Sequence, residues 1–386
     1  MTIAVTIFSS MSWIFNFLVH AGTASIASRK DDKDELHRQV ATLLLFTCAL
    51  AIVSVSGLIL FKNQLYNLFN VSPELLPLVE DYYKGRLWGF PLYLFSLAVL
   101  GILRGLEQVD FTLKMAVIST STNILLTMIF VYQLDWGLWG AALATSLSFG
   151  AQILLTLPPL FKEIQLSKLF SPKKLSHNLL SFGKNSINML MRTASLTSCF
   201  LMATLVVTRQ GEIATASYQI LLELWLISSF FIDGLAITAT IKIASLLAQN
   251  KQNQIHAFSK KLFKISFVLG LALTIIYVSA KTFIVSIFTT DQAVMTKLND
   301  VWLIIALFQP MNALAFILDG IFFGSEDFKF LRNMMVSNLL FVGIPLFYLA
   351  HNNQSFTLIW WAMIAVNAYR VLLGFIHYKS RFTLAR

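Results

Sequence analysis

Residues 91–111 read PLYLFSLAVLGILRGLEQVDF, and residues 310–330 read PMNALAFILDGIFFGSEDFKF. Both stretches contain the pattern Pro-x9-Gly-Ile-x2-Gly-x-Glu-x3-Phe, and they begin 219 residues apart. Further identities follow at the same offset, and they pair His37, Lys62, Phe69, Asp81 and Met115 with His256, Lys281, Phe288, Asp300 and Met334. A series of this length without a gap indicates an internal repeat.

Each copy of the pattern lies in a long apolar run, and such runs recur through all 386 residues. Hydrophobic residues make up 57% of the chain and charged residues 12%, with a mean hydropathy of +0.71. A soluble globule carries about 25% charged residues. The composition therefore excludes a soluble enzyme, a disordered chain and a secreted disulfide scaffold. It predicts an all-α polytopic membrane protein, since the short alternating segments of a transmembrane barrel do not occur.

The apolar runs are long enough for membrane helices, which need about 20 residues to cross a core of about 30 Å. Eleven are predicted, near 3–28, 40–61, 86–104, 114–132, 137–160, 185–208, 216–248, 263–288, 300–323, 333–350 and 355–376. The stretch 334–369 has no Lys, Arg, Asp or Glu, and its expected turn is His351-Asn352-Asn353-Gln354. The offset of 219 residues contains six helices, so the two copies share one topology and form a parallel repeat of two helical bundles.

The repeat also defines the expected domains. We expect an N-terminal lobe over 1–161, a cytoplasmic linker over 162–184 that is partly an interfacial amphipathic helix, and a C-terminal lobe over 185–386. The helix near 185–208 begins the second copy, and its counterpart would precede residue 1. The first lobe thus has five helices and the second has six. We expect one N-terminal helix to be missing, either because Met1 is an internal methionine or because the gene is truncated.

The positions of Lys and Arg predict the orientation. If the loop at 29–38 is cytoplasmic, 20 of these residues fall on the cytoplasmic side and six on the other, namely Lys62, Lys84, Arg86, Arg209, Lys281 and Lys297. This asymmetry is a positive-inside signal and explains the net charge of +10 without a nucleic-acid partner. Residues 1–28 lack the basic start of a signal peptide. We expect a bacterial inner (cytoplasmic) membrane protein with a cytoplasmic C-terminus.

Motifs for enzymatic chemistry are missing from the sequence. It contains no CxxC, HExxH, GxxxxGK[ST] or GxSxG. The two cysteines, Cys48 and Cys199, lie in apolar runs, so a disulfide or zinc framework is not expected. We therefore predict no catalytic residues, no metal site and no cofactor.

Ionisable residues inside membrane helices are costly and usually face a cavity or a partner. The candidates are Arg192, Glu223, Asp233, Lys242, Asp319 and Arg370. Asp233 is the strongest candidate for a functional residue, because it lies mid-helix among apolar residues. A carboxylate there favours a neutralised state and can exchange a proton or cation. The alternative is a static salt bridge to Arg192 or Lys242. Arg192 is expected to balance Asp233 or another carboxylate.

The other polar residues each leave two interpretations open. Asp319 precedes a Gly-Ile pair near the cytoplasmic end of its helix, where it either takes part in the transport pathway or braces the helix end. Glu107 and Glu326 are equivalent in the repeat, which favours an architectural role. Arg370 is expected to extend to the cytoplasmic surface. Three asparagines at membrane depth are candidates to line a pathway: Asn16, Asn188 and Asn312.

These residues and the repeat resemble the multidrug and toxic compound extrusion (MATE) transporters. The segments that resemble the DinF branch are Ile232-Asp233-Gly234-Leu235-Ala236, Leu318-Asp319-Gly320-Ile321-Phe322-Phe323-Gly324 and Asn188-Met189-Leu190-Met191-Arg192-Thr193. The family's glycine-alanine helix start resembles Leu138-Trp139-Gly140-Ala141-Ala142. Lys242 stands where DinF-like members commonly have a polar or acidic residue. The resemblance covers the chain from the family's second helix to its twelfth.

The resemblance implies an exporter of organic cations or other amphiphilic molecules, driven by inward H+ or Na+. Two halves would form a V around a cavity that opens to alternate sides, and the protein would work as a monomer in the lipid bilayer. The implied coupling and substrate-pathway residues are Asp233, Arg192, Asp319, Lys242, Asn188 and Asn16.

Three other functions stay open. A flippase for lipid-linked saccharides would favour several arginines around the cavity, because arginine binds phosphate bidentately. Only Arg192 is expected to lie inside the membrane where it could bind such a phosphate. An integral-membrane enzyme would need a cluster of His, Asp or Cys at a membrane face, which the sequence does not indicate. A truncated, non-functional remnant is the third possibility.

Overall fold

The structure is a computed structural model that describes residues 8, 11–12, 14–68, 74, 76–164 and 175–382. The regular elements in these ranges are helices, and no strand occurs among them. The chain divides into two compact units, Met1–Ile187 and Asn188–Arg386. Part of the helix expected over 3–28 and residues 165–174 of the expected linker lie outside the described residues.

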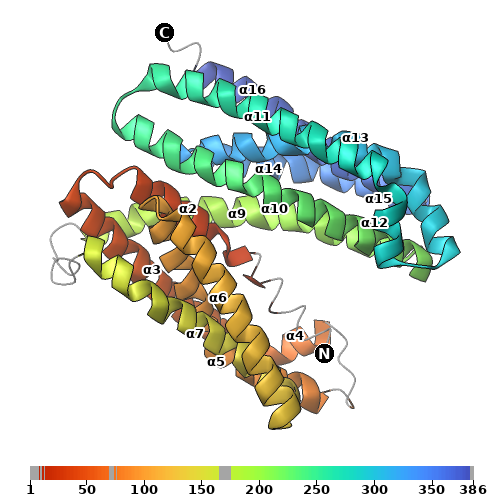
Figure 1. Cartoon of the computed structure of the whole chain (residues 1–386), viewed down its shortest axis with the longest axis horizontal. Helices are drawn as coiled ribbons and strands as arrows, with labels where there is room; N and C mark the ends of the chain where they lie inside the picture. The colour runs from red at the N-terminus through yellow and green to blue at the C-terminus, as the bar shows by residue number, and fades with distance from the viewer. Residues whose placement is uncertain are drawn as a thin grey trace. The chain divides into compact units, whose positions relative to one another are not determined.

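The first unit consists of successive helices that run back and forth (Figure 1). They are α2 (Phe17–Ala27), α3 (Lys33–Leu60), α4 (Lys62–Leu68), α5 (Leu76–Gly105), α6 (Val109–Thr127), the π-helical η1 (Met128–Gln133) and α7 (Gly137–Glu163). Helix α9 (Leu175–Thr208) begins in this unit and continues into the second.

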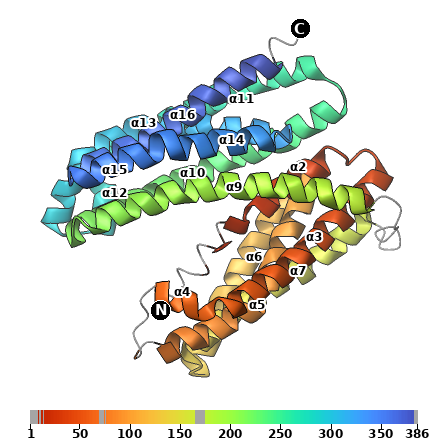
Figure 2. The same cartoon turned by 180° about the vertical axis from the view of Figure 1, so that it is seen from behind.

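The second unit continues with seven α-helices and a further π-helical turn, and Figure 2 shows it from behind. Its elements are α10 (Glu212–Ala248), α11 (Gln252–Ser279), α12 (Lys281–Phe288), α13 (Gln292–Gly324), α14 (Phe328–Asn338), η2 (Leu339–Gly343), α15 (Ile344–Asn352) and α16 (Phe356–Phe382). Helix α13 packs against α10, α11 and α16, so it forms the centre of this unit.

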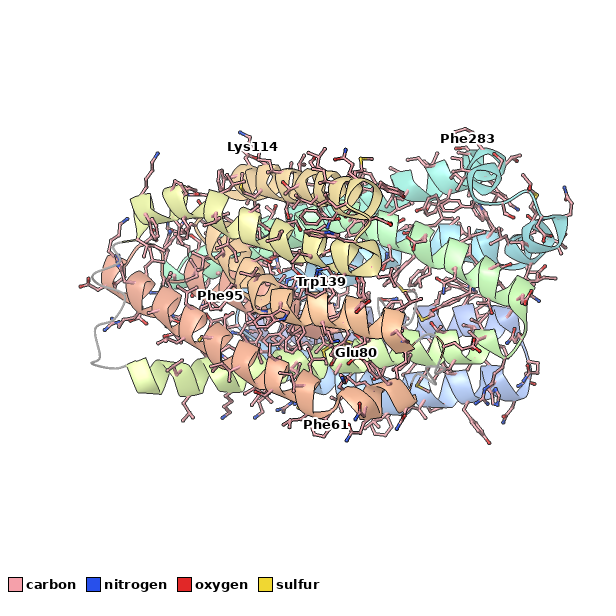
Figure 3. All side chains as sticks on the ribbon, turned by 90° about the horizontal axis from the view of Figure 1, so that it is seen from below. Phe61, Glu80, Phe95, Lys114, Trp139 and Phe283 are labelled. Carbon is pink, nitrogen blue, oxygen red and sulfur yellow. The ribbon has the colours of Figure 1, made fainter. Side chains whose placement is uncertain are left out.

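Ten helices in the described part of the chain are long and apolar enough to cross a membrane, and α2 is a shorter apolar helix within the first predicted span. Large apolar side chains such as Phe61 and Phe283 point outward from their helices (Figure 3), and they are 59% and 70% exposed. Such a surface is stable against lipid tails and not against water. The fold class predicted from the sequence is confirmed.

Several predicted boundaries are wrong. The helix expected at 185–208 begins at Leu175, so the second half of the expected linker 162–184 is helical and belongs to α9. The helix expected at 86–104 begins at Leu76, because the charged first turns pair with α4 instead of ending the helix: Lys62 Nζ lies 2.6 Å from Glu80 Oε1. The helix expected over 263–288 is broken at Ala280 into α11 and the short α12. The predicted turn before α16 is confirmed, with Gln354 in the left-handed region at φ 48°.

The repeat is visible in the helix boundaries, which recur at the offset found in the sequence. Helices α3 and α7 match α11 and α16 at both ends, and the short α4 after α3 matches α12 after α11. The turns match as well, because Glu107 and Glu326 both adopt positive φ, at 64° and 53°. The equivalence of these two glutamates is thus architectural, as expected.

Glycines of the repeated pattern bring helices into close contact in both units. A Cβ on Gly320 would lie 2.4 Å from the carbonyl oxygen of Ala236, so α10 and α13 cross almost backbone to backbone there. The equivalent Gly101 contacts α2, where a Cβ would lie 3.1 Å from the carbonyl oxygen of Val19. Small residues at such crossings are the usual means of packing helices in a membrane.

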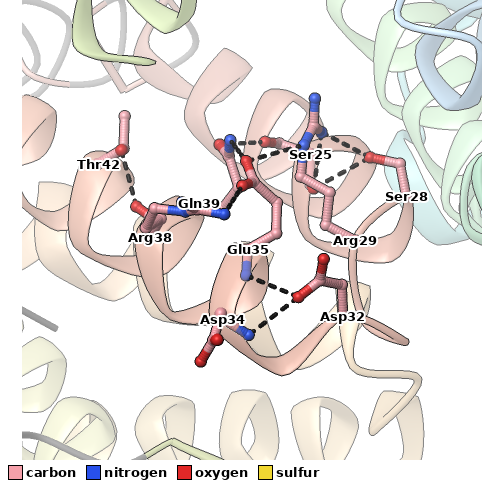
Figure 4. A network of polar contacts seen from close by, with 9 residues as sticks. All are labelled: Ser25, Ser28, Arg29, Asp32, Asp34, Glu35, Arg38, Gln39 and Thr42. Atoms are coloured by element: carbon pink, nitrogen blue, oxygen red, sulfur yellow. Dashed lines mark hydrogen bonds and ion pairs between the residues drawn. The ribbon is translucent and has the colours of Figure 1, made fainter. Parts of the chain in front are cut away.

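The turn between α2 and α3 is held by a polar network (Figure 4). The Asp32 carboxylate caps α3 by accepting hydrogen bonds from the backbone N–H groups of Asp34 and Glu35, each 3.1 Å long. Glu35 also pairs with Arg38 at 2.5 Å. Acidic groups at a helix N-terminus interact favourably with its dipole. The network fixes the direction in which α3 follows α2.

Candidate ion-pair site in the C-terminal unit

Three helices of the second unit each contribute one charged side chain to a single cluster. Asp319 on α13 accepts hydrogen bonds at its Oδ2 from Arg192 on α9 and from Arg370 on α16. The Arg370 Nη2 to Asp319 Oδ2 distance is 2.6 Å. Because the donors belong to helices far apart in sequence, one carboxylate ties α9, α13 and α16 together.

The cluster is buried. Asp319 is 4% exposed, Arg370 2% and Arg192 8%. Removing such charges from water is expensive, and their mutual attraction offsets this only with good geometry and further partners. The cluster has such partners: Arg370 Nη1 donates to Asn367 Oδ1 at 2.6 Å, and the Arg192 guanidinium lies 5.2 Å from the centre of the Phe323 ring.

Asp233 adds a second negative charge near the cluster. It lies on α10, half-buried, and interacts electrostatically with Arg192. Arg192 forms an ion pair with Asp319. The expected carboxylate partner of Arg192 is therefore Asp319. The two positive charges of Arg192 and Arg370 are offset by the negative charges of Asp319 and Asp233. The loss of either negative charge would therefore leave a net positive charge in the cluster.

The glycine crossing positions Asp319. Its neighbour Gly320 presses against α10, and the Thr240 hydroxyl donates to the Gly320 carbonyl at 3.1 Å. This contact fixes the rotation of α13 and so directs Asp319 toward Arg192 and Arg370. The sequence left open that Asp319 only braces the end of its own helix. Its two hydrogen-bond donors, however, come from other helices, so Asp319 joins helices.

None of the remaining predicted site residues forms a hydrogen bond or ion pair with the cluster in the described structure. Asn188 is buried on α9 and accepts a hydrogen bond of 2.7 Å from Arg332 of α14. Lys242 is exposed on α10, and no ion pair is found for it among the described residues. Asn16 is exposed at the start of α2, in the other unit. Asn312 is fully buried, with both amide atoms unpaired.

Two arginines were misjudged from the sequence. Arg370 does not extend to the cytoplasmic surface, since it is buried against Asp319; its spacing of three residues from Asn367 was the available signal. Arg192 is also not the only buried arginine. Arg86 is 8% exposed in the first unit, where its guanidinium lies 5.5 Å from the Phe8 ring and 5.8 Å from the Phe149 ring.

A repeated all-helical bundle with a buried ion cluster and a lipid-facing apolar surface defines a polytopic membrane protein. A family model described as MatE matches residues 1–129 and 189–349. The chain belongs to the MatE family, whose members are transporters and not enzymes.

Individual relatives agree with this assignment. The chain is 31% identical over 337 residues to Protein DETOXIFICATION 43 of Arabidopsis thaliana, covering 84% of the chain and 61% of that protein. It is 22% identical to the Probable multidrug resistance protein NorM of Pasteurella multocida, covering 84% and 72%. A crystal structure of MATE in complex with MaL6 superposes with a TM-score of 0.88 at 18% identity, covering 99% and 87%, which shows the shared fold.

Proposed function

We propose that the chain is a secondary active transporter that exports organic cations or other amphiphilic drugs and metabolites by antiport with H+, through alternating access. The observation that carries this proposal is the buried Asp319, which holds Arg192 and Arg370 at the same oxygen. Few groups in a membrane can change charge, and one that ties three helices together links a chemical event to helix packing.

Protonation of Asp319 provides the coupling step. The protonated carboxyl group no longer offsets two guanidinium charges, so α9 and α16 lose their common anchor on α13. Leaving buried arginines without a counter-charge is unfavourable, and the unit must adopt another packing. Na+ is the alternative ion. The two guanidinium groups oppose the binding of either cation at Asp319, but a metal cation also needs several oxygen ligands, whereas the groups that contact Asp319 are N–H donors of Arg192 and Arg370. This lack of oxygen ligands favours H+.

Asp233 is proposed as the carboxylate that meets a cationic substrate. It is half-buried on α10, and its charge acts on Arg192, so a bound cation or proton there would change the balance of the cluster. Lys242 and Asn16 are exposed and remain candidates to line the pathway. Asn188 would act through Arg332, which it holds in place.

The substrate class draws support from relatives. The Pasteurella protein is named a probable multidrug resistance protein, and the same activity is proposed here. We propose a monomer in a bacterial inner membrane with a cytoplasmic C-terminus. Because the Arabidopsis relatives include two named chloroplastic, fluorescence of a C-terminal fusion in bacterial and plant cells tests this location.

A flippase for lipid-linked saccharides is the second candidate, and one observation favours it. Arg86 is buried, and no carboxylate pairs with it among the described residues, so it is available to a phosphate. Arg192 and Arg370 are already engaged by Asp319. The efflux function therefore ranks first.

Transport by the purified protein in proteoliposomes tests the proposal. A cationic dye such as ethidium should leave its compartment when a pH gradient is imposed, and an equal Na+ gradient without a pH gradient should have no effect. Asp319→Asn should abolish the response to pH. If the Na+ gradient alone drives efflux, or if Asp319→Asn responds to pH as the unmodified protein does, H+ coupling at Asp319 is wrong.

A further inference from the structure

Helix α11 has one face that packs against the protein and one that does not. Leu262, Gly270 and Tyr277 are buried on the side of the helix that contacts α10 and α13. The opposite side carries large apolar side chains, such as Leu271 and Ile275, which are 41% and 66% exposed. In a membrane, an exposed apolar face of this kind is in contact with lipid.

Three lysines continue the outward face toward the N-terminal end of α11. Lys260, Lys261 and Lys264 are all exposed. Residues three or four positions apart are neighbours on a helix surface, and steps of this length join the lysines to the apolar face. The series of exposed residues runs through Lys260, Lys264, Val268, Leu271, Ile275 and Val278. One side of the helix therefore begins with positive charge and goes on with apolar side chains.

The charge of these lysines is not offset by the protein. The sequence from Gly234 to Thr290, which includes all of α11, contains no Asp or Glu. The neighbouring α16, whose Phe375 packs against Phe263 of α11, has no acidic residue either. Asp327, in the turn before α14, is already bound by two side chains of α16. None of the three lysines forms an ion pair among the described residues.

The internal repeat does not account for the lysines. The equivalent positions on α3 are Ala41, Thr42 and Leu45, none of which is charged. The charges that α3 has near its start are paired with each other, as Glu35 is with Arg38. Of these two equivalent helices, only α11 places three unpaired cations beside an exposed apolar face.

The length of this face matches one leaflet of a bilayer. Ile275 follows Lys264 by eleven positions, which corresponds to about 16 Å at 1.5 Å per residue. Half of a hydrocarbon core of about 30 Å is about 15 Å. In the proposed orientation the lysines lie at the cytoplasmic surface, and the cytoplasmic leaflet is the one that carries anionic lipids.

We infer that the outward face of α11 from Lys260 to Ile275 is a binding site for one anionic phospholipid. The ammonium groups of Lys260, Lys261 and Lys264 donate hydrogen bonds to its phosphate oxygens, and an acyl chain lies along the apolar residues that follow. The site does not depend on the proposed coupling at Asp319, because its residues lie on the lipid-facing surface and not in the buried cluster.

Binding of defined lipids to the purified full chain tests this site. Native mass spectrometry measures the affinity for dioleoyl phosphatidylglycerol and for dioleoyl phosphatidylcholine, which has the same acyl chains and no net charge. The site variant combines Lys260→Gln, Lys261→Gln and Lys264→Gln. A second variant with arginine at the same three positions keeps the charge. Size-exclusion chromatography confirms that each variant is folded.

The matched control removes the same amount of charge elsewhere. Lys114, Lys162 and Lys251 are also exposed, and their combined replacement by Gln lowers the net charge equally. The control and the arginine variant should bind phosphatidylglycerol as the unmodified protein does. The site variant should bind it about fivefold more weakly for each lysine removed, and about a hundredfold more weakly in all. Equal losses in the site and control variants overturn the proposal, because they would indicate general charge attraction.

Two further measurements identify the ligand and its place. Glycerol 3-phosphate has a phosphate group and no acyl chain, so it should not displace the lipid; displacement would mean that the site binds a free anion, and the lipid site would be wrong. A phosphatidylglycerol with a photoreactive group in its acyl chain should label α11 between Lys264 and Val278 in the unmodified protein, and much less in the site variant. Labelling that avoids α11, or that is the same in both proteins, also overturns the proposal.

Discussion

The Thr274 hydroxyl on α11 donates a hydrogen bond of 2.7 Å to the carbonyl oxygen of Ala306 on α13. Pro310 lies four residues beyond Ala306 and has no N–H, so α13 itself offers no donor to that carbonyl. Gly270 allows the approach, because a Cβ there would lie 2.4 Å from the Pro310 Cα. Helix α11 thus completes the backbone hydrogen bonding that a proline interrupts inside the membrane.

Thr274→Val should therefore lower the free energy of unfolding by about 1 kcal/mol, the usual value of one intramolecular hydrogen bond. The thermal unfolding midpoint of the detergent-solubilised protein measures the change. Thr238→Val is the control, since the exposed Thr238 donates only to the Gly234 carbonyl of its own helix. Equal shifts of the unfolding midpoint for the two variants would show that the hydrogen bond to Ala306 adds no stability of its own.

Gly320→Ala should prevent close packing of α10 and α13, because the new methyl group would lie 2.4 Å from the Ala236 carbonyl oxygen. We expect a large loss of folded protein and of transport. Gly234→Ala provides the contrast: it lies on α10 with nothing within 4 Å of a Cβ, and alanine is favoured over glycine in a helix by up to about 1 kcal/mol. A well-folded Gly320→Ala protein would contradict the close crossing.

Asp319→Asn should destabilise the protein more than Arg192→Gln. The first change leaves two buried guanidinium groups without their carboxylate, whereas the second leaves Arg370 and Asp319 as a one-to-one pair. Breaking a buried ion pair costs about 3–5 kcal/mol. Unfolding midpoints of both variants and of the double variant give the coupling between the two residues. The reverse order of stabilities would mean that Asp319 is not the centre of the cluster.

Asp233→Asn should reduce gradient-driven efflux of a cationic dye and flatten its dependence on pH, while leaving the folded yield nearly unchanged. The reason is that Asp233 is half-buried and its charge acts on Arg192, whereas Asp319 is the carboxylate that ties α9 to α13. Efflux from proteoliposomes is the measurement, and Lys242→Gln, which removes an exposed charge from the same helix, is measured beside it. Unchanged efflux with an unchanged pH profile would remove Asp233 from the coupling scheme.

Much of the fold was predictable because the repeat and the apolar runs are local features of the sequence. The turn before α16 and the equivalence of Glu107 and Glu326 followed from them. The start of α5 did not, because Glu80 and Asp81 interrupt the apolar run, and only the pairing of Glu80 with Lys62 on α4 shows that the helix continues through them.

The site was harder to predict, since it depends on how each helix is rotated. Asp319 and Arg192 were both recognised as membrane-buried charges, but they are separated by 127 residues, and no local pattern states that they meet. Arg370 was judged by its distance along the chain from the cytoplasmic end. The packing of α16 against α13 turns it inward instead.

The two halves have kept one backbone and diverged in chemistry. The glycines that bring α2 to α5 and α10 to α13 recur at the same offset, whereas Leu100 and Ala151 occupy the positions equivalent to Asp319 and Arg370. Both copies keep the close helix crossings, whereas only the second copy has the Asp319 cluster; the buried Arg86 of the first copy lies at a different position of the repeat. Glycine spacing, more than ionisable residues, should trace the ancestry of either half among distant proteins.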